Sequence, residues 1–254
     1  MKADSFNLGI QKCHRDIDGY QYKMLAVIPA AGIGVRMGMS KPKQFLEISS
    51  TPILAFSLIV LNSCDLVSEI IISTTSSEIS LCQKSIVERY NLDKVTKVVK
   101  GGERRQDSVR YGLEAAEGKY DFVLIHDGVR PFLTNELIES VFKAALKTGA
   151  ATAAVPAKET VKMVTKEGFV KETLDRKSLR LIQTPQIFSF ETIFDAHQTA
   201  LSNGWDDVTD DAEMIERLGH PVEIVAGDER NIKITTPYDL RLASFLCNMI
   251  NKTI

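Results

Sequence analysis

The feature that most constrains the fold is a repeated alternation of strand-like apolar runs with segments of helical periodicity. Met24 to Pro29 (MLAVIP) is a continuous apolar run, as expected of a strand buried on both faces. Between 137 and 146, apolar residues recur at helical spacing, and Gly149 predicts the end of that helix. Strands that alternate with helices need crossover connections. The pattern therefore predicts an α/β fold with an open, mostly parallel sheet and helices on both faces.

The same reading along the chain gives the predicted order of elements. Strands are expected at 24–29, 67–74, 95–99, 120–127, 150–155 and 222–227, and helices at 51–64, 79–90, 109–116, 137–146, 189–203, 210–218 and from 237 onward. There is no internal repeat and no low-complexity tract. We expect one domain over 24–254, preceded by a flexible extension at 1–23.

The alternation of strands with helices is interrupted at about 156–180. Here TVKMVT and VKETL flank Lys166-Glu167-Gly168-Phe169, a hairpin signal with no helical pattern beside it. A hairpin inserted into a parallel α/β domain needs a surface to pack on. We therefore expect an arm that reaches a second subunit and makes a homodimer.

Composition excludes several classes of partner. The 254 residues carry a net charge of −2, so neither nucleic acid nor an anionic membrane is expected. No apolar run approaches the length of a membrane span, and residues 1–23 lack the apolar stretch of a secretory signal. The four cysteines lie far apart, which favours free thiols in a reducing, cytoplasmic setting over a zinc site.

A glycine-rich segment, PAAGIGVRMGMSKPKQF at 29–45, follows the first predicted strand. At that position backbone N–H groups converge on phosphates. The dinucleotide fingerprint fails because Met37 stands where its last glycine is needed, and there is no Gly-Lys-Ser/Thr of a P-loop. Arg36, Lys41 and Lys43 lie close together, which favours a triphosphate.

The motifs in this order resemble those of the cytidylyltransferases that act on methylerythritol phosphate and ribitol phosphate, within the Rossmann-like sugar-phosphate nucleotidyltransferases. The motifs are PAAGIGVRMG with PKQF, GGERRQDSVRYGL (101–113), HDGVRPF (126–132), TLDRKSL (173–179), QTPQIF (183–188), DVTDDA (207–212) and NIKITTPYDL (231–240). RQDSV and TLDR are more similar to the methylerythritol branch, since the ribitol branch tends to carry R-N-x-T.

The resemblance implies that a cytidylyl group passes from CTP to 2-C-methyl-D-erythritol 4-phosphate, with release of pyrophosphate, in non-mevalonate isoprenoid synthesis. Ribitol 5-phosphate is the alternative acceptor. An NAD-binding oxidoreductase is disfavoured by the displaced glycine and the basic run. A binding protein without activity is disfavoured because Arg36, Lys43, Lys233 and Arg176 occur together.

The resemblance also implies site residues. Arg36, Lys43 and Lys233 would surround the triphosphate and stabilise the charge of the transition state. Lys41 is expected to be a surface charge. The predicted CTP contacts are Ala30, Ala31, Gly32, Gly34, Gly101, Asp107, Ser108 and Asp127, with a helix-capping role as an alternative for Asp107 and Ser108.

On the acceptor side, the resemblance implies Asp127, Arg130, Thr160, Arg176 and Thr209, with Arg176 contributed across the dimer interface. Asp127 is also the one predicted Mg²⁺ ligand, because magnesium takes few carboxylates beside substrate phosphates. We expect His126 and His197 to be packed residues. Asp210 and Asp211 are expected to cap a helix.

Overall fold

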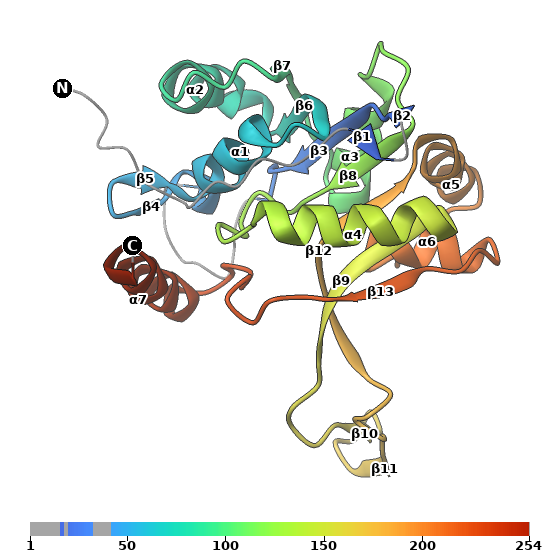
Figure 1. Cartoon of the computed structure of the whole chain (residues 1–254). Helices are drawn as coiled ribbons and strands as arrows, with labels where there is room; N and C mark the ends of the chain where they lie inside the picture. The colour runs from blue at the N-terminus through green and yellow to red at the C-terminus, as the bar shows by residue number, and fades with distance from the viewer. Residues whose placement is uncertain (1–15, 18–19, 33–41, 254) are drawn as a thin grey trace.

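A seven-stranded sheet organises the molecule in the computed structural model, which describes residues 16–17, 20–32 and 42–253 (Figure 1). The strands lie in the order β13-β9-β12-β8-β3-β6-β7. Their bounds are β3 Met24–Pro29, β6 Val67–Thr74, β7 Val95–Lys100, β8 Phe122–Ile125, β9 Ala150–Pro156, β12 Arg180–Ser189 and β13 Glu223–Ala226. All neighbouring pairs are parallel except those of β12, which is antiparallel to β8 and β9. The predicted α/β fold is confirmed.

Helices cover both faces of the sheet (Figure 1). They are α1 Ile53–Ser63, α2 Ile79–Cys82 continued by a π-helix η4 Gln83–Glu88, α3 Arg105–Glu114, α4 Asn135–Thr148, α5 Phe190–Ser202, α6 Asp211–Arg217 and α7 Pro237–Thr253. One buried apolar cluster joins α1, η4 and α4 to the sheet, and another joins α3, α5 and α6 to its other face. Gly149 ends α4 with a φ of 81°, the left-handed conformation that glycine adopts without a steric penalty.

Strand β12 was not predicted, although it lies in the middle of the sheet. Pro185 cannot donate a ladder hydrogen bond, and proline argues against a central strand. The structure accommodates it at an irregularity in the pairing of β12 with β9, between Ile182 and Gln186. The chain between Pro29 and α1 also holds more structure than predicted. A short 3-10 helix, η2 Lys43–Phe45, and a two-residue hairpin, β4 Glu47–Ile48 with β5 Thr51–Pro52, lie there.

The predicted hairpin is present, and it projects from the body between the ends of β9 and β12 (Figure 1). Its tip is formed by β10 Lys162–Val164 and β11 Val170–Thr173, paired antiparallel. We refer to residues 157–179 as the arm.

The segment before β3 lies partly against the body. Tyr20–Gln21 (β2) pairs with Asp16–Ile17 (β1). The Tyr22 ring contacts the rings of Phe122 and Phe142 edge-on, and the Lys23 amide donates to Asp121. Most of the predicted extension, 1–15 with 18 and 19, lies outside the described residues.

Candidate active site

A pocket opens at the carboxyl ends of the parallel strands β3, β7 and β8. Its lining is Pro29 to Gly32, Lys43, Gln44, Gly102 to Arg105, Ser108, Asp127, Val129 and Lys233. Ligands of open α/β sheets bind at this edge. Four basic and two acidic side chains line the pocket, in a chain whose net charge is −2. The basic residues are therefore concentrated where an anionic ligand would enter.

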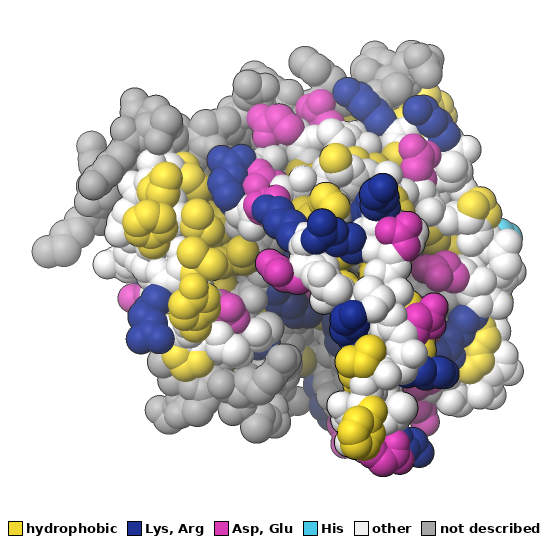
Figure 2. All heavy atoms as spheres, turned by 90° about the horizontal axis from the view of Figure 1, so that it is seen from below, with side chains coloured by type: hydrophobic (Ala, Val, Ile, Leu, Met, Phe, Trp, Pro, Cys, Tyr) yellow, Lys and Arg dark blue, Asp and Glu magenta, His cyan; other side chains and the backbone are white. Residues whose placement is uncertain are grey.

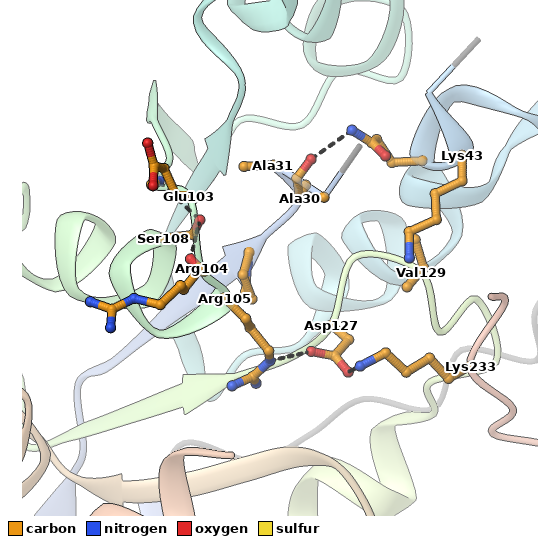
Figure 3. Close-up of a pocket in the computed structure, with 14 residues that line it drawn as sticks. Ala30, Ala31, Lys43, Glu103, Arg104, Arg105, Ser108, Asp127, Val129 and Lys233 are labelled. Atoms are coloured by element: carbon orange, nitrogen blue, oxygen red, sulfur yellow. Dashed lines mark hydrogen bonds and ion pairs between the residues drawn. The ribbon is translucent and has the colours of Figure 1, made fainter. Parts of the chain in front are cut away.

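The end of β3 forms one wall. Gln44, in η2, donates to the carbonyl of Ala30 at 2.7 Å, and the Ala30 amide donates to Ser73 at 2.7 Å. Gln44 therefore ties η2 to the strand end and places Lys43 beside Gly32. In Figure 3, Lys43 points from η2 toward Val129. Gly34 and Arg36, predicted here, and Lys41 lie outside the described residues.

The turn after β7 forms the opposite wall. A side chain at Gly101 would collide with Ala31 at 2.5 Å and with the Ser108 hydroxyl at 2.8 Å, so only glycine allows the two loops to approach this closely. The Ser108 hydroxyl accepts from the amide of Gly102 at 3.1 Å. Ala31 and Ser108, predicted CTP contacts from the first and second motifs, are thus brought together.

Asp107 does not line the pocket. Its carboxylate accepts from Arg104 Nε at 2.8 Å and from the Arg104 amide at 3.4 Å, across the first turn of α3. Asp107 thus has the helix-capping role that was expected as the alternative to a CTP contact. The hydrogen bond from Arg104 is the main reason why the pKa of Asp107 lies below its usual value. Burial alone would raise this pKa. Arg104, in contrast, does line the pocket.

Asp127, just beyond β8, is the electrostatic centre of the pocket. Its Oδ1 accepts from Arg105 Nε at 2.7 Å, and its Oδ2 lies 2.8 Å from Lys233 Nζ and 3.6 Å from Arg130 Nε. Figure 3 shows Arg105 and Lys233 approaching the carboxylate from opposite sides. Burial by itself would raise the pKa of Asp127, but Arg105, Lys233 and Arg130 hold it well below its usual range.

Lys233 reaches this position although it follows β13, at the far edge of the sheet. The amide of Ile234 donates to the carbonyl of Val129 at 2.9 Å, and Arg130 Nη1 donates to the carbonyl of Asn231 at 2.7 Å. These two bonds fasten the segment around Lys233 to the loop after β8. Arg130 is buried and lines a second cavity, at the base of the arm.

His126 is fully buried, as predicted, and its hydrogen bonds define its tautomer. Nε2 must donate to the carbonyl of Arg130 at 3.0 Å, which leaves Nδ1 to accept from the Thr184 hydroxyl at 3.1 Å. The same hydroxyl accepts from the Asp127 amide at 3.0 Å. Burial lowers the pKa of His126 to about 4, so the ring is neutral at pH 7. It fixes the loop that carries Asp127.

The remaining predicted acceptor residues lie apart from this pocket in the single chain. Thr160 and Arg176 are exposed on the arm, where Arg176 Nη1 donates to the carbonyl of Lys158 at 2.7 Å. Thr209 is exposed before α6, and its amide and hydroxyl both donate to Glu213 at 2.8 Å. Asp210 caps α6, as predicted, by accepting from the Glu213 amide at 3.0 Å.

Sequence reasoning missed Arg105 and Asp211. Arg105 Nη1 lies 2.6 Å from Asp211 Oδ2, and Asp211 is fully buried. Both residues stand in quoted motifs, GGERRQDSV and DVTDDA, but their spacing does not reveal which arginine or aspartate points inward. His197, set aside as a packed residue, is buried and lies 3.1 Å from Asp211.

The donor set is compatible with a magnesium ion held beside phosphates. No three His, Cys, Asp or Glu side chains cluster as a metal site within residues 16–17, 20–32 and 42–253. Magnesium that is carried mainly by substrate phosphates needs one or two carboxylates. Asp127 supplies one, already ionised and already facing cations. No helix in the described part of the chain is long and apolar enough to cross a membrane.

Comparisons with known proteins identify one family. The family model of 2-C-methyl-D-erythritol 4-phosphate cytidylyltransferase matches residues 24–249. The enzymes of that name from Syntrophus aciditrophicus and Geobacter metallireducens are each 46% identical, over 87% of this chain and 94% and 95% of theirs.

Two solved structures share the fold. The 4-diphosphocytidyl-2C-methyl-D-erythritol synthase of Anaerococcus prevotii is 30% identical with a TM-score of 0.78, and the cytidylyltransferase of Thermus thermophilus is 31% identical with a TM-score of 0.74. Each alignment covers 89% of this chain and 99% of the other. The chain belongs to the 2-C-methyl-D-erythritol 4-phosphate cytidylyltransferase family.

Proposed function

We propose that this enzyme transfers the cytidylyl group of CTP to 2-C-methyl-D-erythritol 4-phosphate, giving 4-diphosphocytidyl-2-C-methyl-D-erythritol and pyrophosphate in isoprenoid precursor synthesis. Membership of the family supports the substrates. The observation that carries the chemistry is the Asp127 carboxylate, set among Arg105, Arg130 and Lys233 in a pocket at the carboxyl edge of the sheet.

In the proposed reaction an oxygen of the acceptor phosphate attacks the α-phosphorus of CTP, and the bond to the pyrophosphate oxygen breaks. A phosphate monoester is already nucleophilic at pH 7, so no general base is required. Negative charge spreads over the oxygens around the α-phosphorus as five groups crowd about it. Positioned cations therefore supply most of the acceleration.

We assign Lys43 and Lys233 to the α-phosphate and Arg36 to the phosphates that leave. Asp127 Oδ2 holds Lys233 Nζ at 2.8 Å. The ammonium therefore already lies in the pocket before CTP binds, and little reorganisation is needed. The cytosine and ribose are assigned to the wall at Ala30, Ala31 and Gly32 on one side and to Gly101 and Ser108 on the other. A wrong base would leave polar groups unpaired there. Gly34 and Asp107 remain predicted contacts, although Gly34 lies outside the described residues and Asp107 caps α3 in the single chain.

We assign Mg²⁺ to Asp127, through the oxygen that faces Lys233. A bound magnesium ion neutralises part of the triphosphate charge and orients the phosphates. Asp127 contributes an ionised carboxylate at pH 7, and Arg105 keeps its other oxygen in place. The acceptor is assigned to Asp127 and Arg130 of one chain, and Thr209, which lies outside the pocket lining in the single chain, remains a predicted third contact.

We further propose a homodimer in which the arm brings Thr160 and Arg176 to the partner's pocket. The arm carries exposed apolar side chains, of which Phe169 is 73% and Val170 60% exposed. Figure 2 looks onto the face from which the arm projects and shows such side chains among charged ones. Arginine suits the acceptor phosphate through its bidentate fork. Sedimentation at micromolar concentration is expected to give twice the chain mass of 28.2 kDa.

A cytoplasmic location is part of the proposal. Cys82 and Cys247 are buried free thiols, which suits a reducing compartment.

The test of the reaction is pyrophosphate release with CTP and Mg²⁺, with methylerythritol 4-phosphate and ribitol 5-phosphate in separate assays. Release only with methylerythritol 4-phosphate, lost in Lys43→Ala, is the expected result. Release only with ribitol 5-phosphate would move the chain to the other acceptor, and no release with either would refute the proposed activity. Lys158→Ala, exposed at the base of the arm, is the matched lysine control.

A further inference from the structure

A chain of largely buried ionisable side chains runs from the pocket into the body of the domain. Arg105, the first residue of α3, lies between two carboxylates. Its Nε is 2.7 Å from Asp127 Oδ1, and its Nη1 is 2.6 Å from Asp211 Oδ2. The other oxygen of Asp211 lies 3.1 Å from His197 Nε2, on α5. Three helices and one strand end are thereby connected through one guanidinium group.

Both carboxylates depend on this cation. Asp211 is 0% exposed and Asp127 is 5% exposed. Burial alone would raise the pKa of Asp211, but Arg105 and His197 keep it below the usual value. Burial also opposes the charge of Arg105, yet Asp211 and Asp127 raise the pKa of Arg105 above its ordinary value. At pH 7 the set is therefore a fixed pattern of carboxylate, guanidinium and carboxylate.

Stability alone is a weak reason for such a set. Desolvation of buried charges offsets much of their attraction, and well-packed apolar residues would serve a core equally well. A guanidinium fork has a different property, since it fixes the plane and position of a carboxylate. Here the fixed carboxylate is Asp127, the residue that faces Lys233 in the pocket.

Asp211 is itself held firmly. It opens α6, directly after the capping residue Asp210. The next amide, of Ala212, donates to the Gln186 side chain at 3.3 Å, and Gln186 Nε2 donates to Asp210 at 2.8 Å. The buried strand β12 therefore sets the position of Asp211, and Asp211 sets that of Arg105.

We propose that Arg105 and Asp211 are positioning residues for Asp127: Arg105 retains Oδ1 of Asp127, so that Oδ2 is directed at Lys233. The proposal rests on the proposed cytidylyl transfer. Asp211 does not itself line the pocket, and its ion pairs are with Arg105 and His197 and not with Asp127, so it acts through Arg105. The geometry of Asp127 thus depends on an aspartate that the sequence motif suggests only as a cap.

The test is Asp211→Asn in the full-length enzyme, which keeps the side-chain volume and removes the charge. Loss of a group that orients a site residue costs about 10- to 100-fold in activity. We expect kcat to fall within that range, with KM for CTP within about threefold of wild type, because the walls at Ala31 and Ser108 are untouched. A purely structural role predicts a lower Tm with kcat and KM unchanged, and that result would overturn the proposal.

Two further variants complete the experiment. His197→Gln alters the same buried cluster but keeps a donor for Asp211, and it is expected to lower Tm while kcat stays near wild type. Arg105→Lys keeps a charge but loses the fork, and it is expected to lose at least as much kcat as Asp211→Asn. If Asp211 acts through Arg105, the double variant is no slower than Arg105→Lys alone. If the kcat loss of the double variant equals the product of the two single losses, the proposal is contradicted.

Failure of this inference is separable from failure of the proposed function. An inactive wild-type enzyme would remove the function itself. An active wild-type enzyme whose Asp211→Asn variant keeps its kcat would remove only the positioning role. If Asp211→Asn does not fold, the comparison of Arg105→Lys with His197→Gln decides the question.

Discussion

The nucleotide pocket and the arm differ in how much of their structure a single chain completes. In the pocket, Arg104, Arg105 and Lys233 are each paired with a carboxylate, and Asp127 by itself contacts three cations. On the arm, Met163, Val164, Phe169 and Val170 are each at least 41% exposed, and Arg176 donates only to a backbone carbonyl within the arm's base. The pocket is organised for binding before any partner arrives. The arm has apolar surface whose burial would stabilise an association.

The largest loss of activity is expected from substitutions in the pocket. Lys43→Ala and Lys233→Ala each remove a cation from the proposed α-phosphate site, so kcat is expected to fall on the order of a hundred- to a thousand-fold. Steady-state pyrophosphate release measures this loss. Lys158→Ala, at the arm base, is the control and is expected to stay within about threefold of wild type. Equal losses in all three variants would erase the distinction between the two regions.

An intermediate effect is expected on the arm. Arg176→Ala removes the proposed grip on the acceptor phosphate, so kcat/KM for methylerythritol 4-phosphate is expected to fall by about 10- to 100-fold. The affinity for CTP, measured by calorimetry without acceptor, is expected to be unchanged because Arg176 does not line the pocket. Lys177→Ala, the exposed neighbour on the same turn, serves as the control. A weakened CTP affinity in Arg176→Ala would contradict the separation.

The smallest effect concerns the segment that follows Lys233. Asp239 Oδ2 accepts from the Thr235 amide and hydroxyl and from the Thr236 amide, which fixes the start of α7. Asp239→Asn is expected to cost about 1 kcal/mol of the free energy of unfolding at pH 7. Denaturant titration of both proteins at several pH values measures it.

The pH dependence of that difference follows from the pKa of Asp239. Burial opposes the shift, but the hydrogen bonds from Thr235 and Thr236 hold this pKa below its usual value of 3.8. A carboxylate with a lowered folded pKa contributes stability that is present above the unfolded pKa and is lost as pH falls through the folded pKa. The difference between wild type and Asp239→Asn is therefore expected to shrink as the pH falls below 3.8 and to vanish below the folded pKa of Asp239. A difference that grows on acidification would contradict this assignment.

Local patterns predicted the parts of the molecule that local physics determines. β3 and β6 have the predicted bounds, because their side chains are buried on both faces of a parallel sheet. The hairpin was predicted from its turn residues. Asp127 and Lys43 were predicted from the family motifs, and both line the pocket at the carboxyl edge of the sheet.

Long-range relations were not predictable in this way. β12 contains Pro185, which argues against a central strand until its neighbours β8 and β9 are known. The Arg105–Asp211 pair joins α3 to α6 across 106 positions of sequence, so no spacing rule indicates it. Gln44 became informative only when its bond to Ala30 was seen. The sequence predicts which residues carry the chemistry, and the structure shows which side chains contact Asp127 and Lys233.

We propose that each active site combines the pocket of one chain with the arm of another. Mixing two variants of low activity tests this most directly. Lys43→Ala and Arg176→Ala chains, unfolded together and refolded in equal amounts, are expected to regain about a quarter of wild-type activity, since half of the dimers carry one intact site. Refolding each variant alone is the control. Activity no higher than that of the separate variants would contradict the shared site and place Arg176 with the pocket of its own chain.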